Sequence, residues 1–280
     1  MIKPAVKSLN SNAVAHRGPT MGDGQRLEHS GCNGSFFARI KHYGGVIHYA
    51  TGAYPALFFP LHRLLGEVDT GPVVTPDTDL LIEGFPRSGN TFAVCAFELA
   101  QPRPVNTAHH IHVPAQLIRA ARYHVPACIL ARRPEDAARS LLVKYPFLKL
   151  RHVLRGYAGF YEKCLRYREH FVAATFDDVV TDFGGVIDRI NRRFGTGFHR
   201  LEASEENVRR VFRCIDDRNG REPIDPIFGS ARPNLQKELA KQSIRLPDDD
   251  PVLARYRAIF EVYLLLARDV DPPLTERRAR

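Results

Sequence analysis

The sequence has no hydrophobic run long enough to span a membrane. Residues 46–65 are its most apolar stretch, but a glycine, two prolines, two histidines and an arginine interrupt them. A spanning helix needs about 20 predominantly apolar residues. Residues 1–24 also lack the apolar core of a secretory signal peptide. We therefore predict neither a transmembrane helix nor a secretory leader.

Cysteines are few and scattered, and the sequence has no internal repeat and no low-complexity tract. The five cysteines are Cys32, Cys95, Cys128, Cys164 and Cys214. Their number is odd, and none lies in the CxxC or Cys/His spacing that is typical of zinc sites. This pattern favours free thiols in a reducing compartment, so we predict a cytoplasmic location.

The sequence carries a surplus of positive charge. Forty Lys and Arg residues exceed 31 Asp and Glu residues, which gives a formal net charge of +9. Such a surplus attracts anionic ligands. Charge alone does not choose among nucleic acid, acidic lipid, a phosphorylated cofactor and a sulfated glycan.

The chain divides into an N-terminal extension, residues 1–75, and a domain over residues 76–280. We expect the extension to be only partly ordered, with short amphipathic helices near 45–67 that are broken at Pro55 and Pro60. Packing of residues 46–66 on the flank of the domain is favoured over peripheral contact with a membrane, which stays open.

Short apolar runs alternate with helical patterns in the domain. Strands are predicted at 79–84, 126–131 and 171–176, and helices at 90–99, 135–142, 148–167, around 186–194 and at 252–267. Alternation of this kind predicts an α/β fold, a mainly parallel sheet flanked by helices.

The segment at 84–91, GFPRSGNT, follows the first predicted strand and opens a helix. Free backbone N–H groups and the positive end of the helix dipole meet there, which favours an anion. The candidate ligands are Arg87, Ser88, Gly89, Asn90 and Thr91. An ordinary Ser/Gly turn that caps a helix is the structural alternative.

The same segment differs from the nucleotide P-loop, GxxxxGK followed by Ser or Thr. Asn90 occupies the lysine position, and the cation is three residues upstream at Arg87. The second strand ends in Arg132 and Arg133, not in an acidic magnesium ligand. The pattern therefore disfavours a kinase or ATPase and predicts an anion site that needs no metal.

A second anion element follows the second strand. Arg132 ends this strand, and Ser140 lies two turns along the next helix, so the two could hold one phosphate from two sides. Taken alone, both residues would be ordinary surface residues.

Together the two elements resemble the sulfotransferases that use 3′-phosphoadenosine-5′-phosphosulfate (PAPS). The family's first signature, Y/F-P-K-S-G-T/N-T, is similar to residues 85–91 and binds the 5′-phosphosulfate. Its second, R-N/R-P-x-D with a serine eight residues after the arginine, is similar to residues 132–140 and binds the 3′-phosphate. A third motif, Y-E-D-L-x-x-D-P after a strand, is matched in outline by residues 175–182. The resemblance implies a single P-loop-like α/β domain, with PAPS as sulfuryl donor.

The sequence departs from this family at several positions. Arg87 replaces the usual lysine, and an arginine can stabilise charge but cannot readily give up a proton. Phe92 stands where the family often has tryptophan. The C-terminal RKGxxG element has no clear counterpart, and Arg232 and Lys237, in an expected polar loop, are the nearest candidates for its contacts with the 3′-phosphate.

Histidines lie between the two anion elements. Many family members carry a catalytic histidine in a K-T-H-x-P context there, which His112 resembles; His110 is the second candidate. If residues 105–113 form a strand, these two share a face and His109 points away. Surface or capping histidines and a metal site are the alternatives, and no nearby Cys or Glu cluster supports a metal.

We therefore predict a sulfotransferase whose histidine base activates a hydroxyl or amine of a small-molecule or glycan acceptor. The sequence does not identify the acceptor or the oligomeric state, and we predict no nucleic-acid partner. Two alternatives remain, a kinase or NTPase with a degenerate P-loop and a non-catalytic basic binding module. Clustered basic and aromatic side chains would favour the second alternative, but the charges here are dispersed.

Overall fold

Four short apolar segments pair as a parallel sheet in the computed structural model, which describes residues 51–65, 71–219, 231–246 and 251–268. The strands are β1 (Leu80–Gly84), β2 (Thr107–His109), β3 (Ala127–Ala131) and β4 (Val172–Thr175), in the order β2-β1-β3-β4. β1 and β3 are buried along their whole length. Their near-continuous hydrophobic sequences are typical of parallel strands covered on both faces.

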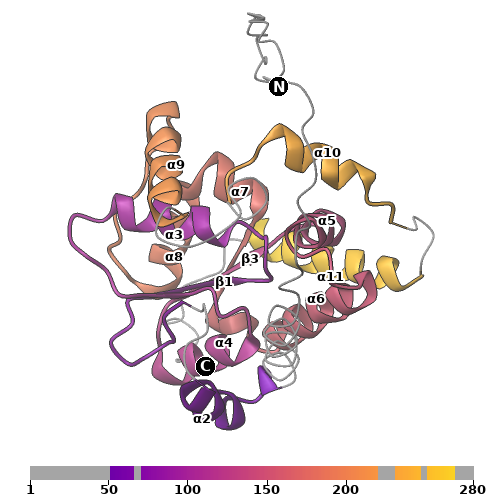
Figure 1. Ribbon diagram of the computed structural model, residues 1–280. Coiled ribbons are helices and arrows are strands. Elements are labelled where there is room, and N and C mark those ends of the chain that lie inside the picture. Colours follow the sequence, from indigo (N-terminus) through magenta and orange to yellow (C-terminus); the bar gives the residue numbers. More distant parts are fainter. Residues whose placement is uncertain (1–50, 66–70, 220–230, 247–250, 269–280) are drawn as a thin grey trace, which may run out of the picture. The chain divides into compact units, whose positions relative to one another are not determined.

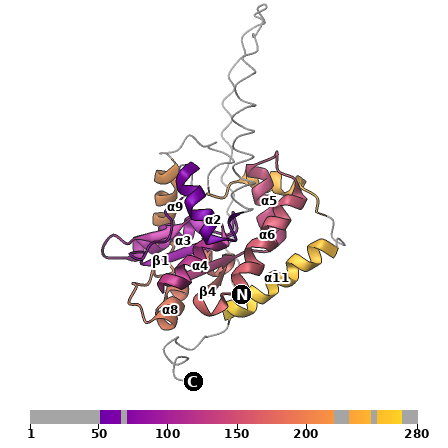
Figure 2. The ribbon, with the colours of Figure 1, turned by 90° about the horizontal axis from the view of Figure 1, so that it is seen from below.

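Helices cover both faces of this sheet (Figures 1 and 2). The helical elements are α2 (Pro55–Leu65), α3 (Asn90–Ala100), α4 (Pro114–Tyr123), α5 (Pro134–Lys144), α6 (Leu150–Leu165), the 3-10 turn η1 (Arg168–His170), α7 (Phe176–Thr181), α8 (Phe183–Phe194), α9 (Glu205–Asn219), α10 (Leu235–Ser243) and α11 (Pro251–Arg268). One face packs against α3, α8 and α9, and the other against α4, α6 and α11. The predicted α/β fold with a parallel central sheet is confirmed.

Two hydrophobic cores arise from the alternation of side chains along the strands. In β1, Leu80 and Ile82 enter the core beneath α3 and α8, whereas Leu81 enters the core beneath α4 and α6. β3 divides in the same way, with Cys128 on the first side and Ile129 on the second. Each fully buried large side chain contributes about 1.5–3 kcal/mol relative to exposure, so the cores hold the strand ends in a fixed arrangement.

Helix α2 corrects one expectation. Pro60 lies inside the helix and does not break it, although Pro55 does stand at its start. The helix continues because Phe58 and Phe59 are buried against Ile111 and Val113, and this packing offsets the one backbone hydrogen bond that proline removes. Contact of residues 46–66 with a membrane stays a prediction.

None of the described helices is long and apolar enough to cross a membrane.

Several elements were not foreseen. α4, α7 and α9 have no predicted counterpart, and Lys237 lies in the first turn of α10 instead of in a loop. Asn234 caps α10 by accepting a hydrogen bond from the Lys237 N–H at 2.9 Å. The division of the chain at residue 75 stays a prediction, and residues 1–50, which hold most of the expected extension, lie outside the described residues.

Candidate functional site

The turns after β1 and β3 lie side by side at the carboxyl edge of the sheet. β1 and β3 are neighbouring parallel strands, with Gly84 paired to Leu130. β2 flanks β1 on the other side, so the chain's connections diverge between β1 and β3. In open α/β sheets, ligands bind at this kind of switch point, outside the carboxyl ends of the strands.

The turn after β1 combines left-handed backbone with open N–H groups. Arg87 has φ 72° and Gly89 has φ 94°, with Ser88 between them outside the left-handed region. Alternation of this kind forms concave sites for anions. Gly89 is the N-cap of α3, which has no side-chain cap. Among the described residues, none accepts a hydrogen bond from the N–H groups of Gly89, Asn90 or Thr91.

Glycine is required at the end of β1 for a different reason. A Cβ atom at Gly84 would lie 2.5 Å from the carbonyl oxygen of Leu130 and 3.2 Å from Oδ1 of Asn90. A side chain there would separate β1 from β3 and displace Asn90 from beneath the turn. The strand pairing and the turn therefore depend on the same residue.

Arg87 and Arg132 lie in one site. Nη1 of Arg132 donates to the Arg87 carbonyl oxygen at 3.0 Å, and Nε of Arg87 donates to Oγ of Ser140 at 3.0 Å. The Arg132 guanidinium also lies over the Phe176 ring, 3.9 Å from its centroid. The sequence-predicted Arg87, Arg132 and Ser140 are thus brought together from the turn after β1, the end of β3 and α5.

These two arginines form a strongly positive, partly desolvated site. Burial lowers the pKa of both, and proximity to Arg132 lowers the pKa of Arg87 further. Nε of Arg132 is buried and has no hydrogen-bond partner. Buried donors without partners are costly, and only an acceptor that reached this buried atom would satisfy it.

Two of the predicted polar ligands hold the turn instead of facing outward. Tyr161 donates its hydroxyl proton to the Leu130 carbonyl at 2.7 Å, so the buried Ser88 hydroxyl, 3.2 Å away, donates to Tyr161. Nδ2 of Asn90 donates to the Phe85 carbonyl oxygen at 3.2 Å, while its buried Oδ1 has no partner. Their side chains thus support the cradle from below.

The C-terminal candidates lie together on the α9 and α10 side. Nζ of Lys237 donates to the Arg232 carbonyl oxygen at 2.8 Å, and Lys237 is 3% exposed. The Arg232 side chain pairs with Asp216 and lies over the Phe212 ring, both on α9, and it is 54% exposed. Burial lowers the pKa of Arg132, and two nearby carboxylates oppose this shift: first Asp136, and then Glu238, the next residue in α10. α10 therefore borders the Arg132 site.

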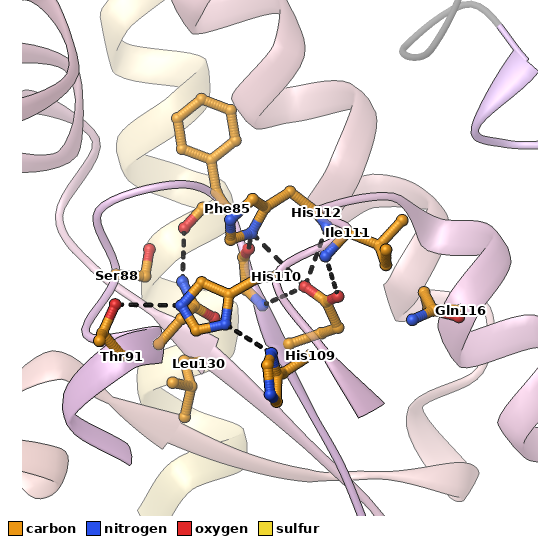
Figure 3. A network of polar contacts seen from close by, with 12 residues as sticks. Phe85, Ser88, Thr91, His109, His110, Ile111, His112, Gln116 and Leu130 are labelled. Atoms are coloured by element: carbon orange, nitrogen blue, oxygen red, sulfur yellow. Dashed lines mark hydrogen bonds and ion pairs between the residues drawn. The ribbon is translucent and has the colours of Figure 1, made fainter. Parts of the chain in front are cut away.

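His112 is held by β1, as Figure 3 shows. Its Nδ1 lies 2.7 Å from the Gly84 carbonyl oxygen, which can only accept, so Nδ1 carries the proton. In the neutral ring Nε2 then holds a lone pair. The side chain is 19% exposed. A partly exposed ring whose Nδ1–H is fixed in this way can accept a proton at Nε2 from a bound molecule.

His110 is placed differently. Its Nε2 lies 3.0 Å from Oγ1 of Thr91, and its Nδ1 lies 2.8 Å from Nδ1 of His109. Burial lowers the pKa of His110 well below its usual value, and His112 and His109 lower it further. Both ring nitrogens are thus occupied within the protein.

The condition for His109 to point away, a strand over residues 105–113, is not met. β2 ends at His109, the His109 ring contacts that of His110, and His110 and His112 both adopt left-handed backbone, with φ 61° and 59°. The reason is Glu83, which accepts hydrogen bonds from the N–H groups of Ile111 at 2.7 Å and His112 at 3.1 Å. These bonds replace strand pairing.

Glu83 is the residue of the candidate site that the sequence analysis missed. It is 1% exposed, and one of its oxygens lies 3.5 Å from Nδ1 of His112. A glutamate inside an otherwise apolar strand, LLIEG, was the available signal, because buried carboxylates need specific partners.

Metal ligands do not gather among the residues that the structure describes: no three His, Cys, Asp or Glu side chains are placed to hold an ion.

One solved structure that the chain resembles is a sulfotransferase. It is the crystal structure of mouse sulfotransferase SULT7A1 complexed with PAP, with 11% sequence identity and a TM-score of 0.40. The similarity covers 69% of this chain and 90% of that chain. No protein-family model and no curated protein matches the sequence.

Proposed function

We propose that this chain is a sulfotransferase that moves a sulfuryl group from PAPS to a hydroxyl or amine of an acceptor. The observation that carries the proposal is that Arg87 and Arg132 lie in one site. Nη1 of Arg132 donates to the backbone carbonyl oxygen of Arg87 at 3.0 Å. A nucleotide phosphorylated at both the 3′ and 5′ positions needs two anion sites a ribose apart. Two adjacent strand-ending turns, each with an arginine, would supply them.

The phosphosulfate end would bind at the turn after β1. The open N–H groups of Gly89, Asn90 and Thr91 would contact its oxygens, and the Arg87 guanidinium would do so after giving up its bond to Ser140. The 3′-phosphate would bind Arg132, whose buried Nε lacks a partner, together with Ser140. Arg232 and Lys237 would approach the same phosphate from the α10 side.

The transfer step would use the two sides of this site. Nε2 of His112 would accept the proton of the acceptor hydroxyl as that oxygen bonds to sulfur. As the bond between sulfur and the bridging oxygen of PAPS breaks, negative charge develops on that oxygen. Arg87 and the backbone N–H groups of the turn after β1 would stabilise this charge. Adenosine 3′,5′-bisphosphate then leaves, and His112 returns its proton to solvent.

The acceptor would be a small molecule or a glycan. Tyr145 and Phe147 follow α5, which carries Ser140. They are 38% and 69% exposed and meet edge to face at 5.9 Å. Exposed aromatic rings suit stacking on a sugar or another ring, so carbohydrates and phenols are the first acceptors to test.

A kinase or NTPase is the second candidate, but the site, as far as the described residues form it, lacks the lysine and the acidic residue that such enzymes use to bind phosphate and magnesium. Asn90 stands at the position of the phosphate-binding lysine, and its side chain is buried beneath the turn. β3 is followed by Arg132 where a magnesium-binding acid would be expected.

The deciding experiment compares ligands by thermal shift. Adenosine 3′,5′-bisphosphate should raise Tm by several degrees without a divalent ion, and EDTA should not change the effect. A preference for ATP with Mg²⁺ would reject the proposal. Transfer of ³⁵S from labelled PAPS to a panel of glycans, phenols and alcohols then tests the chemistry.

A further inference from the structure

Two of the described cysteines meet between α3 and α9. Sγ of Cys214 lies 2.8 Å from Sγ of Cys95, although the two residues are 119 apart in the sequence. Of the other described cysteines, Cys128 is buried in the same hydrophobic core as this pair and Cys164 in the core on the other face, and neither has a sulfur contact with another described cysteine. The thiol pair is therefore a specific feature of one helix–helix contact.

The contact is held in register on both sides of the thiols. Towards the start of α3, the rings of Phe92 and Phe212 meet at 5.8 Å. Towards its end, Glu98 forms an ion pair with Arg218. The three contacts follow one another in the same order along both helices, and Figure 1 shows α9 crossing close to α3. Sliding of one helix along the other would break the contact between Phe92 and Phe212 or the ion pair between Glu98 and Arg218.

The two thiols differ in access. Cys95 is fully buried, and burial and the hydrogen bond from Cys214 raise the pKa of its thiol. Cys214 is only partly buried. An oxidant from solvent therefore reaches Cys214 first, with Cys95 already in contact behind it.

We infer that Cys95 and Cys214 are a site of reversible disulfide formation that cross-links α3 to α9. The oxidant is a hydroperoxide. In the first step the Cys214 thiol takes one oxygen from the peroxide, giving a sulfenic acid and one water or alcohol. In the second, Sγ of Cys95 displaces the hydroxyl from that sulfur, and the hydroxyl leaves as water with the Cys95 proton. Two thiols are oxidised and one peroxide is reduced.

The cross-link would act next to the proposed nucleotide site. α3 begins at the turn after β1, and α9 carries Phe212 and Asp216, which contact Arg232. A disulfide would tie the helix behind the first anion turn to the helix that supports Arg232. The inference itself rests on the thiol contact and not on the proposed sulfotransferase activity.

The experiment uses the full chain, reduced and then treated with a few equivalents of hydrogen peroxide. Non-reducing peptide mapping should recover one cross-linked peptide that joins Cys95 to Cys214. Because the bond closes a long loop, Tm should rise by roughly 5 °C and return with dithiothreitol. Cys214→Ser should abolish both effects, whereas the matched control Cys32→Ser should keep both.

Two results would overturn the inference. One is a disulfide between Cys214 and Cys32. The other is oxidation of Cys214 to sulfinic acid while Cys95 remains open to alkylation after unfolding. Both are read directly on the wild-type protein by mass spectrometry, so neither depends on whether a variant folds.

Discussion

At the scale of single residues, the site depends on arginines that the fold partly dehydrates. Arg132 donates one nitrogen to the Arg87 carbonyl, stacks on Phe176 and keeps Nε without a partner. A side chain fixed on two sides keeps its orientation before a ligand arrives. Such preorganisation lowers the entropic cost of binding.

The Arg132 role gives the first prediction. Arg132→Ala should weaken binding of adenosine 3′,5′-bisphosphate about 10- to 100-fold, since a charge-assisted hydrogen bond contributes about 1.5–3 kcal/mol. Binding of adenosine 5′-phosphate, which lacks the 3′-phosphate, should change far less. Calorimetric titration of both nucleotides measures the difference.

Arg133→Ala is the matched control, because Arg133 is exposed at the N-cap of α5 and should leave both affinities nearly unchanged. An equal loss for the two nucleotides in Arg132→Ala would remove Arg132 from the 3′-phosphate site.

The histidines give the second prediction. His112→Ala should leave affinity for adenosine 3′,5′-bisphosphate near normal and lower kcat at least ~100-fold, the lower range for loss of a general base. His110→Gln should lower kcat much less, because both nitrogens of His110 already bond within the protein. Steady-state kinetics with a common acceptor compares the two. Unchanged turnover in His112→Ala would move the base to another residue.

Sequence reasoning found the arginines and histidines at this scale but not what orients them. The spacing within FPRSGNT and from Arg132 to Ser140 is local, so it could be recognised from the sequence. The bonds from Glu83 to Ile111 and His112 join residues 28 and 29 positions apart. They depend on β1 lying beside β2, which local spacing cannot reveal.

At the scale of elements, predictions succeeded where the pattern was strong. β1, β3, α3, α5, α6, α8 and α11 were all foreseen because their apolar residues recur with a clear period. α9 was missed because its mean hydropathy is low, although Val211 and Ile215 are fully buried. α7 has only six residues, and its start depends on a capping box between Thr175 and Asp178.

The turn between β2 and α4 gives a pH prediction. The folded protein keeps His110 neutral, because burial, His112 and His109 lower its pKa. The unfolded chain binds a proton at His110 below about pH 6.5. Unfolding therefore takes up a proton, and folding stability falls as the pH decreases below that value.

Urea unfolding at pH 7.5 and 5.5 measures this effect. Between these two values, wild type should lose roughly 1 kcal/mol more of its unfolding free energy than His110→Gln, whose amide cannot titrate. His109, whose pKa burial also lowers, contributes the same sign in both proteins. Identical losses in the two proteins would show that His110 titrates in the folded protein as it does in the unfolded chain, and would contradict the prediction.

At the scale of the whole molecule, the order of the strands determines which residues meet in the candidate site. β2 and β3 lie on opposite sides of β1 and run parallel to it. The turns that follow all three strands therefore lie at the same edge of the sheet. Residues 53 positions apart in the sequence thus meet in one site, as with Arg87 and Ser140. This gathering could be predicted only through the family resemblance, since no local pattern specifies strand order.

The net charge of +9 leads to the last prediction. A multiply charged nucleotide that binds through Arg87, Arg132 and open N–H groups is attracted by charges that dissolved salt screens. Raising the salt from 50 to 500 mM should weaken binding of adenosine 3′,5′-bisphosphate about 3- to 10-fold. Adenosine, which carries no phosphate, is the uncharged reference, and its affinity should change far less. In Arg132→Ala the salt effect should be smaller, because one of the screened contacts is gone. An affinity that does not change with salt would mean that hydrophobic contacts with the base, and not the two arginine turns, supply the binding energy.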